Sequence, residues 1–190
     1  NNKPIYLQFA LDQSYHQDGF YTFPTDQFMK EEIIRSKSIG LNGIRIHIKT
    51  EIPRKLYWAD KLGLLVVEDL PNSWGEPNKL MKAESEYTLR QMIKRDYNHP
   101  SIISWVIFNE QWGLKTKQVE IINEGPWENE GKIILPETFA WVASMYYLAK
   151  SLDQSRLIED NSPCCGGVHT ATDINSWHAY LPGYEWDEYL

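Results

Sequence analysis

The sequence predicts an α/β fold of the (β/α)8 TIM-barrel type, with about six of the eight βα units present. Apolar runs of strand length alternate with segments of helical periodicity along the whole chain, which is the pattern of repeated βαβ units. The runs are almost continuously apolar, as expected of parallel strands that are buried on both faces. A complete barrel takes about 250 residues, or about 31 for each unit, so a chain of 190 residues accommodates about six units.

Six apolar runs are expected to be the strands of this barrel. In chain order they comprise residues 4–11, 43–48, 64–70, 102–110, 156–160 and 173–180, of which the last two are the weaker. A doubly wound open sheet is the alternative arrangement of such units. The sequence argues against it, because no Gly-rich loop for a dinucleotide or a phosphate follows any of the runs.

Four segments between the strands have the periodicity and the end signals of helices. They comprise residues 25–38, 53–62, 78–97 and a segment that begins at Pro136. Thr25 is expected to cap the first helix with its side-chain oxygen. Pro53 suits the first turn of the second helix, and Gly63 is expected to end it.

Residues 111–135 form a connection that is too long for a plain turn. The segment is rich in Glu, Asn, Gly and Trp. Because it follows a strand, it lies on the C-terminal face, where barrel enzymes carry their active sites. We therefore expect it to form a lid or wall of a pocket and to be among the more mobile regions.

The composition is that of a folded chain, and it argues against some classes of partner. Hydrophobic residues make up 42% of it and charged residues 24%, so it can bury a sizeable core. No apolar stretch reaches the roughly 18 residues of a membrane helix, and the polar first residues form no signal peptide. The compartment stays open, although a bacterial source would slightly favour the periplasm or the exterior.

The net charge of −7 argues against a nucleic-acid partner. Two adjacent cysteines, Cys164 and Cys165, are expected to be free thiols.

Aromatic residues are unusually frequent, with 8 Trp, 11 Tyr and 6 Phe. They fit either a well-packed core or flat rings that line a groove for a sugar. Trp74, Trp112, Trp127 and Trp177 lie in or beside the segments that follow strands, and each is a candidate either for stacking on a sugar ring or for packing. The five histidines lack the spacing of paired metal ligands, so neither a metal nor another cofactor is expected.

Polar side chains stand at the ends of four predicted strands. They form the pairs Arg45 and His47, Glu68 and Asp69, Asn109 and Glu110, and His178 and Tyr180. Charged groups are costly to bury unless they are paired, so ion pairs that cap the barrel are one explanation. Because a barrel gathers its active site at the C-terminal ends of its strands, we expect the set to surround one pocket.

Glu110 is the strongest candidate for chemistry in this set. It follows the apolar Trp105 and Phe108, so its charged form should be disfavoured and its pKa raised. Such a carboxyl group suits a general acid that protonates a leaving oxygen near neutral pH. The amide of the preceding Asn109 can hold a hydroxyl group of a ligand.

The sequence around this pair resembles the acid/base signature of glycoside hydrolase family 2. The signature comprises Arg-Asp-Tyr-Asn-His-Pro-Ser-Ile-Ile-Ser-Trp at residues 95–105, followed by Asn109 and Glu110. Residues 40–45 and 59–69 are similar to the second and third strands of that family, and residues 2–7 to its usual lead into the first strand. The family includes β-galactosidases, β-glucuronidases and β-mannosidases, and the resemblance covers nearly the whole chain.

The resemblance implies a retaining β-glycosidase that acts on a glycoside or oligosaccharide. By position, Glu110 would be the acid/base and Asn109 would contact the sugar 2-hydroxyl group. Arg45 would support the nucleophile, Tyr180 would donate a hydrogen bond to it, and His178 would contact the sugar. The chain departs from the family pattern in two places: His47 stands two residues after the arginine, and the acidic pair reads Glu68-Asp69. These three residues are substrate-binding candidates by resemblance, together with Trp74 and Trp112 from their positions.

A retaining enzyme needs a second carboxylate about 5 to 5.5 Å from the first. In the family it ends strand seven, and this chain ends after the predicted strand six. Glu185 and Glu188 are alternatives within the chain, but they follow Pro182-Gly183 in a polar, aromatic loop. We therefore expect the nucleophile to lie outside this sequence.

Residues 1–190 are accordingly interpreted as one catalytic-barrel domain, truncated on its C-terminal side and without the β-sandwich domains that precede such barrels. Further domains of the same parent chain would be its partners, with no membrane. Two alternatives remain open from the sequence. One is a carbohydrate-binding barrel that lacks catalysis, and the other is a related barrel glycosidase such as an endo-mannanase.

Overall fold

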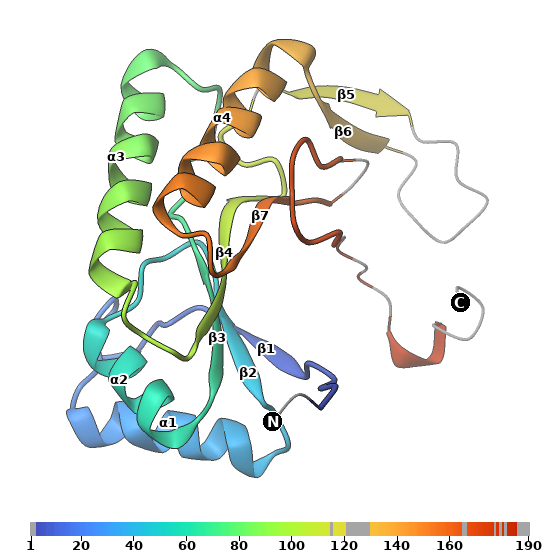
Figure 1. The fold of residues 1–190 in the computed structure, drawn as a ribbon. Helices are drawn as coiled ribbons and strands as arrows, with labels where there is room; N and C mark the ends of the chain where they lie inside the picture. The colour runs from blue at the N-terminus through green and yellow to red at the C-terminus, as the bar shows by residue number, and fades with distance from the viewer. Residues whose placement is uncertain are drawn as a thin grey trace.

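A computed structural model describes residues 3–114, 116–120, 130–164, 167–176, 178, 180 and 182–185 of the chain. Its centre is a five-stranded parallel sheet in the order β1-β2-β3-β4-β7. The helices lie on one side of this sheet (Figure 1). The strand order follows the chain without reversal, as in a barrel, whereas a doubly wound sheet reverses its order at a switch point. The predicted α/β barrel type is confirmed, and the sheet is open.

Five of the six predicted strands are confirmed. They are β1 (Phe9–Asp12), β2 (Gly43–Ile46), β3 (Leu65–Asp69), β4 (Ile102–Asn109) and β7 (Leu157–Ser162). β1 is shorter than expected and begins only at Phe9. β4 is the longest strand and all of its residues except one are buried, which agrees with its apolar sequence.

The sixth predicted strand, residues 173–180, is wrong. None of the described residues between 167 and 185 forms a strand. The segment nevertheless runs beside β7, because Asp173 N donates to Ile158 O at 2.8 Å and His178 N donates to Pro163 O at 2.9 Å. It therefore occupies the place next to β7 that the sequence assigned to it.

Side chains of the segment explain why no ladder forms. The backbone N–H of Ile158 donates to a carboxylate oxygen of Asp173 at 2.9 Å, and that of Asp160 donates to the hydroxyl of Thr172 at 3.4 Å. In a parallel ladder these two groups of β7 would bond to backbone carbonyls of the neighbouring strand. Short polar side chains compete with the backbone in this way.

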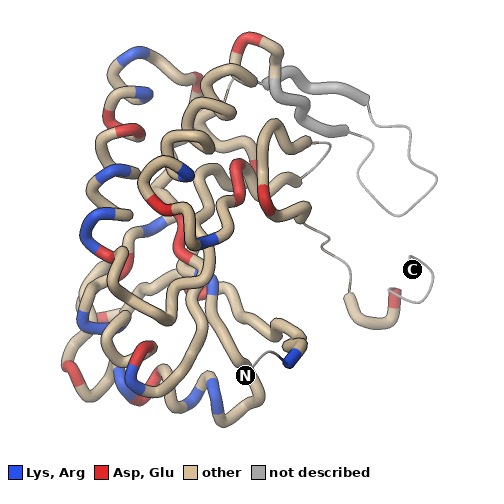
Figure 2. Tube along the Cα trace, viewed as in Figure 1, with Lys and Arg blue, Asp and Glu red and all other residues tan. Residues whose placement is uncertain are grey.

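The four predicted helices are confirmed. They are α1 (Asp26–Ser38), α2 (Pro53–Leu62), α3 (Lys79–Asp96) and α4 (Pro136–Leu152). Phe28 N donates to the Thr25 hydroxyl at 3.0 Å, which is the expected N-cap. Gly63 ends α2 with a φ of 69°, a left-handed conformation that glycine adopts at low cost. Residues of both charges are distributed along α3 (Figure 2), as expected of a helix with a solvated outer face.

The long connection between β4 and α4 contains a hairpin that the sequence did not predict. Its strands are β5 (Thr116–Glu120) and β6 (Glu130–Ile134), which pair antiparallel. Residues 121–129 lie outside the described residues. That the segment forms a mobile lid stays a prediction.

The hydrophobic core lies between the sheet and the helices. It includes Val66 and Trp105 from the sheet, and Leu56, Leu89 and Val142 from three helices. No helix in the described part of the chain is long and apolar enough to cross a membrane. The expectation of free thiols is wrong, because Cys164 is disulfide-bonded.

Candidate active site

The guanidinium group of Arg45 joins the carboxyl ends of the strands. Arg45, on β2, donates from Nε and Nη2 to the two carboxylate oxygens of Asp69 on β3, at 3.0 and 2.9 Å. Nη2 also donates to Asn109 Oδ1 on β4 at 3.0 Å, and Nη1 donates to Ser162 Oγ on β7 at 2.9 Å. Because neighbouring strands are parallel, their C-terminal ends meet at one edge, and a donor-only guanidinium can bridge several acceptors there.

Asp69 is fully buried at this edge. Burial raises its pKa, while the charge and hydrogen bonds of Arg45 act in the opposite direction. The bidentate geometry fixes the plane of the guanidinium group. Asp69 also accepts a hydrogen bond from Ile48 N at 3.0 Å, which holds the chain as it leaves β2.

Glu110 follows β4 in a strained backbone conformation. Its φ is 49° and that of Gln111 is 60°, which places two consecutive non-glycine residues in the left-handed region. Glu110 N donates to Ser162 O at 2.8 Å, so β7 holds the turn in place. Strain of this kind persists where the surroundings enforce it, and it is frequent at functional sites.

The carboxylate of Glu110 is half-buried and accepts hydrogen bonds from two side chains. His178 Nδ1 lies 2.6 Å from Glu110 Oε1, and the hydroxyl of Tyr180 donates to the same oxygen. The hydrogen bond from His178 lowers the pKa of Glu110, and that from Tyr180 adds to it, against an opposing effect of burial. The expectation of a raised pKa is therefore wrong for this arrangement, because the sequence did not reveal the two donors. Burial and the bond to Glu110 raise the pKa of Tyr180 to about 12.

His178 connects Glu110 to Arg45. Its Nε2 lies 2.7 Å from Ser162 Oγ and 3.3 Å from Arg45 Nη1. One imidazole ring thus separates Glu110 from Arg45. The structure brings together most of the predicted set, namely Arg45, Asp69, Asn109, Glu110, His178 and Tyr180.

The structure does not place Glu68 in this cluster. Successive side chains of a strand point to opposite faces, so Glu68 faces the helices while Asp69 faces Arg45. Glu68 Oε1 accepts a hydrogen bond from Glu51 N at 2.8 Å, and burial raises the pKa of Glu68 to about 8. The expectation that Glu68 lines the pocket is wrong for this reason.

Trp74, Trp112 and His47 form a row of rings beside the cluster. The ring centroids of Trp74 and Trp112 are 4.0 Å apart at an angle of 31°, and those of Trp112 and His47 are 6.0 Å apart. Burial lowers the pKa of His47, while the charge of Asp69 acts in the opposite direction. Trp74 is 74% exposed, so core packing does not explain its position. Trp127 and Trp177 lie outside the described residues.

Asn109 is buried, and of its two amide atoms only the oxygen has a hydrogen-bond partner in the described part of the chain. Its Oδ1 accepts from Arg45, whereas Nδ2 has no hydrogen-bond partner among the described residues. A buried donor without a partner is costly. The backbone N–H of Asn109 donates to Asn72 Oδ1 at 2.7 Å, and Asn72 Nδ2 donates to the carbonyls of Leu70 and Ile107. Asn72 thereby ties the ends of β3 and β4 together.

Sequence reasoning missed three residues near the cluster, namely Asn72, Glu159 and Ser162. Glu159 on β7 is buried, accepts a hydrogen bond from Ser176, and has a pKa that burial raises. Asn72 and Ser162 are small polar residues at strand ends, and that position was the available signal. For Ser162 the predicted strand ended two residues too early.

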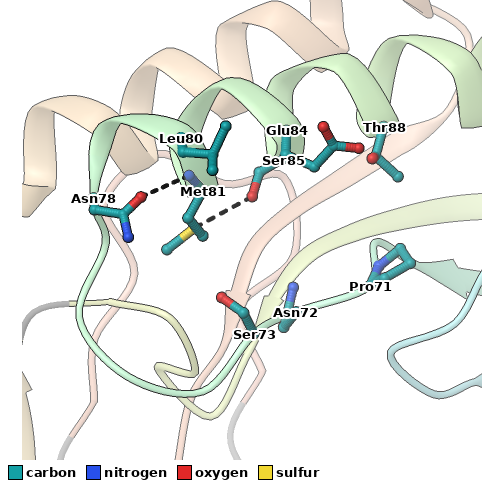
Figure 3. A pocket seen from close by; sticks show the side chains of 9 residues that line it. All are labelled: Pro71, Asn72, Ser73, Asn78, Leu80, Met81, Glu84, Ser85 and Thr88. Carbon is teal, nitrogen blue, oxygen red and sulfur yellow. Dashed lines mark hydrogen bonds between the residues drawn. The ribbon is translucent and has the colours of Figure 1, made fainter.

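A groove of about 490 Å³ lies between α3 and the segment that follows β3 (Figure 3). Asn72 and Ser73 line one side of it, and Asn78, Met81 and Glu84 line the other. None of the predicted site residues contributes to its lining. Among the described residues, no group of three or more His, Cys, Asp or Glu side chains is placed to hold a metal ion.

Comparison with known proteins finds relatives with this fold. A β-galactosidase of Thermoanaerobacterium thermosulfurigenes is 39% identical over 93 residues, which are 49% of this chain and 13% of that protein. A β-galactosidase of Alteromonas mediterranea is 27% identical over 182 residues, 92% of this chain and 15% of that protein. The fold is also similar to the crystal structure of Parabacteroides merdae β-glucuronidase with glycerol in its active site. The match covers 100% of this chain and 23% of that chain, with a TM-score of 0.76 and 21% sequence identity.

The chain thus spans 13% and 15% of the two relatives it matches in sequence. The family model described as "Glycosyl hydrolases family 2, TIM barrel domain" matches residues 1–182. The chain belongs to glycosyl hydrolase family 2 and comprises sequence of its TIM barrel domain.

Proposed function

We propose that this chain is part of a retaining β-glycosidase of the β-galactosidase type, in which Glu110 is the general acid/base. The observation that carries the proposal is the position of Glu110, on a strained turn at the end of β4 and one imidazole ring away from Arg45. Membership of glycosyl hydrolase family 2 supports the reaction class. The relatives named as β-galactosidases support the kind of substrate.

Glu110 acts twice in this reaction. As an acid it protonates the glycosidic oxygen while a carboxylate from outside this chain attacks the anomeric carbon. As a base it then takes a proton from the water that releases the sugar. The ionised form that His178 and Tyr180 favour suits the second step. For the first step, a negatively charged nucleophile at about 5.5 Å raises the pKa of Glu110 by like-charge repulsion, and this repulsion ends when the nucleophile is glycosylated.

Three further residues of the cluster bind and orient the substrate and the nucleophile. The unpartnered Nδ2 of Asn109 is a donor for the 2-hydroxyl group of the sugar. Arg45, held by Asp69, supplies positive charge for the nucleophile. The hydroxyl of Tyr180 bonds to Glu110 in the structure. We assign it as a second donor to the carboxylate of the nucleophile.

The exposed Trp74 and the half-buried Trp112 offer a flat apolar surface next to His47. A sugar ring has apolar faces that stack on such surfaces. We assign this surface to the part of the substrate next to the cleaved bond. Glu68, which faces the helices, has no contact with substrate in this proposal.

Azide rescue of the full-length Glu110→Gln protein tests the proposal. With an aryl β-glycoside that has a good leaving group, the glycosyl-enzyme should form and then persist, because no base activates water. Azide should raise turnover and give a β-glycosyl azide, since it attacks without a base. The wild type and the control Glu86→Gln, an exposed residue of α3 paired with Arg90, should show no azide effect.

Unchanged turnover of Glu110→Gln, with no azide product, would refute the assignment of Glu110. A wild type that binds sugar without hydrolysing any glycoside would favour a carbohydrate-binding barrel instead.

A further inference from the structure

His178 has protein partners at both ring nitrogens. Nδ1 lies 2.6 Å from Glu110 Oε1, and Nε2 lies 2.7 Å from Ser162 Oγ and 3.3 Å from Arg45 Nη1. The side chain is about one-fifth exposed. A hydrogen bond to a sugar hydroxyl would have to displace one of these partners. The imidazole therefore fits a role within the protein network better than the role of a sugar contact.

The partners at Nε2 determine which nitrogen carries the proton in the neutral ring. A guanidinium group only donates, so Ser162 Oγ accepts from Arg45 Nη1 at 2.9 Å. The hydroxyl hydrogen of Ser162 has two acceptors within reach, His178 Nε2 at 2.7 Å and the carboxylate of Glu159. The nearby positive charge of Arg45 also disfavours a proton on Nε2. Nε2 is accordingly an acceptor, and Nδ1 carries the hydrogen that is donated to Glu110.

We propose that His178 is a positioning residue for Glu110, with Arg45 and Ser162 fixing the tautomer that donates from Nδ1 to the Glu110 carboxylate. This role rests on the proposed function of Glu110. Its consequence is that His178 sets the pH at which Glu110 exchanges its proton. A donor to a carboxylate favours the ionised form, so His178 lowers the pH range over which the acid is available.

Several other charged and titratable groups surround Glu110. They are Tyr180 in the segment after β7, His47 and Arg45 at the end of β2, and, beyond Arg45, Asp69 on β3 and Glu159 on β7. Of the two direct donors to the carboxylate, His178 has the larger effect on the pKa of Glu110. The test must therefore change His178 while leaving the others in place.

Two substitutions separate the two nitrogens of His178. The amide nitrogen of an Asn side chain stands as many bonds from Cβ as Nδ1, and that of a Gln side chain as many as Nε2. His178→Asn can therefore keep the donor to Glu110, whereas His178→Gln removes it and keeps a polar group near Ser162. The experiment measures kcat/KM against pH for the full-length protein and both variants, with thermal unfolding to verify that each is folded.

The basic limb of the profile reports the pKa of the acid in the free enzyme. In His178→Gln it should move to higher pH by about one unit or more, as loss of a hydrogen bond to a charged group predicts. In His178→Asn it should stay within about 0.3 unit of the wild type. A raised KM with an unmoved basic limb in both variants would identify His178 as a sugar contact and overturn the proposal.

A double-mutant cycle gives a second, independent readout. If His178 acts through Glu110, His178→Gln should have little further effect on kcat/KM in a protein that already carries Glu110→Gln. Equal effects of His178→Gln with and without Glu110→Gln would overturn the proposal. The same cycle reports the proposed function separately, because that function fails if Glu110→Gln alone leaves turnover unchanged.

Discussion

Glu110 combines a strained backbone with two hydrogen-bond donors to its side chain. Its left-handed φ costs of order 1–3 kcal/mol for a non-glycine residue, and the bond from Glu110 N to Ser162 O helps to hold it. The turn directs the carboxylate toward His178 and Tyr180 instead of continuing the alternation of β4. The conformation thus places the proposed acid/base one imidazole ring away from the guanidinium of Arg45.

The free donor of Asn109 gives a prediction at the residue scale. If Nδ2 binds the sugar 2-hydroxyl group, Asn109→Ala should lower kcat/KM for an aryl β-glycoside about 10- to 100-fold, the effect of one lost hydrogen bond to substrate. The matching 2-deoxy glycoside, which lacks that hydroxyl, should lose much less. Steady-state kinetics with the two substrates provides the check. Equal losses for both would show that Asn109 only supports Arg45.

Among the elements, those with strong local signals were predictable from the sequence. The cap at Thr25, the stop at Gly63 and the buried run of β4 each specify their element locally. The segment from 173 to 180 is a weaker apolar run, and none of its described residues forms a strand. Side chains of Asp173 and Thr172 accept hydrogen bonds from two backbone N–H groups of β7. These bonds replace those of a β-ladder, and they depend on contacts in three dimensions that the local sequence does not reveal. The hairpin of β5 and β6 was missed because its polar, Gly-containing composition resembles a loop.

The candidate site, too, was predictable from the sequence only in part. Parallel strands bring their C-terminal ends together, so the meeting of Arg45, Asn109 and Glu110 was predictable from strand ends alone. The face on which a side chain lies depends on exact register, and Glu68 was misplaced because one residue separates the two faces of β3. The lowered pKa of Glu110 depends on donors 68 and 70 residues further along the chain, which sequence patterns do not reveal.

Glu68 gives a prediction for the interface between β3 and the helices. Its pKa of about 8 in the folded protein lies above the value of about 4.3 in an unfolded chain. The stabilisation by the protonated carboxyl is therefore complete below about pH 4 and is lost as the pH rises through about 8. Glu68→Gln stays neutral, so its Tm should fall less than that of the wild type between about pH 5 and pH 8.

Thermal unfolding of the full-length proteins across this pH range measures the difference. Glu86→Gln on the exposed face of α3 is the matched control and should follow the wild type. Parallel Tm profiles for Glu68→Gln and the wild type would mean that Glu68 is ionised in the folded protein.

In the described part of the chain, helices cover one side of a parallel sheet whose strands follow chain order, and a charged cluster lies at the C-terminal ends of these strands. The chain spans a small part of its relatives, and the proposed nucleophile lies outside it. We therefore expect the 190-residue chain alone to give no turnover of aryl β-glycosides, whereas the full-length protein hydrolyses them. Turnover by the short chain that Glu185→Gln or Glu188→Gln abolishes would move the nucleophile into this sequence.

The dependence of Glu110→Gln on the leaving group tests the central claim most directly. In the full-length protein, kcat/KM should fall about 10²- to 10⁴-fold for alkyl β-glycosides, whose leaving oxygen needs a proton. For a dinitrophenyl β-glycoside, whose leaving group departs without protonation, the first step should remain within about tenfold of the wild type. Equal losses for the two leaving groups would contradict the account, because Glu110 would then act on something other than the departing oxygen.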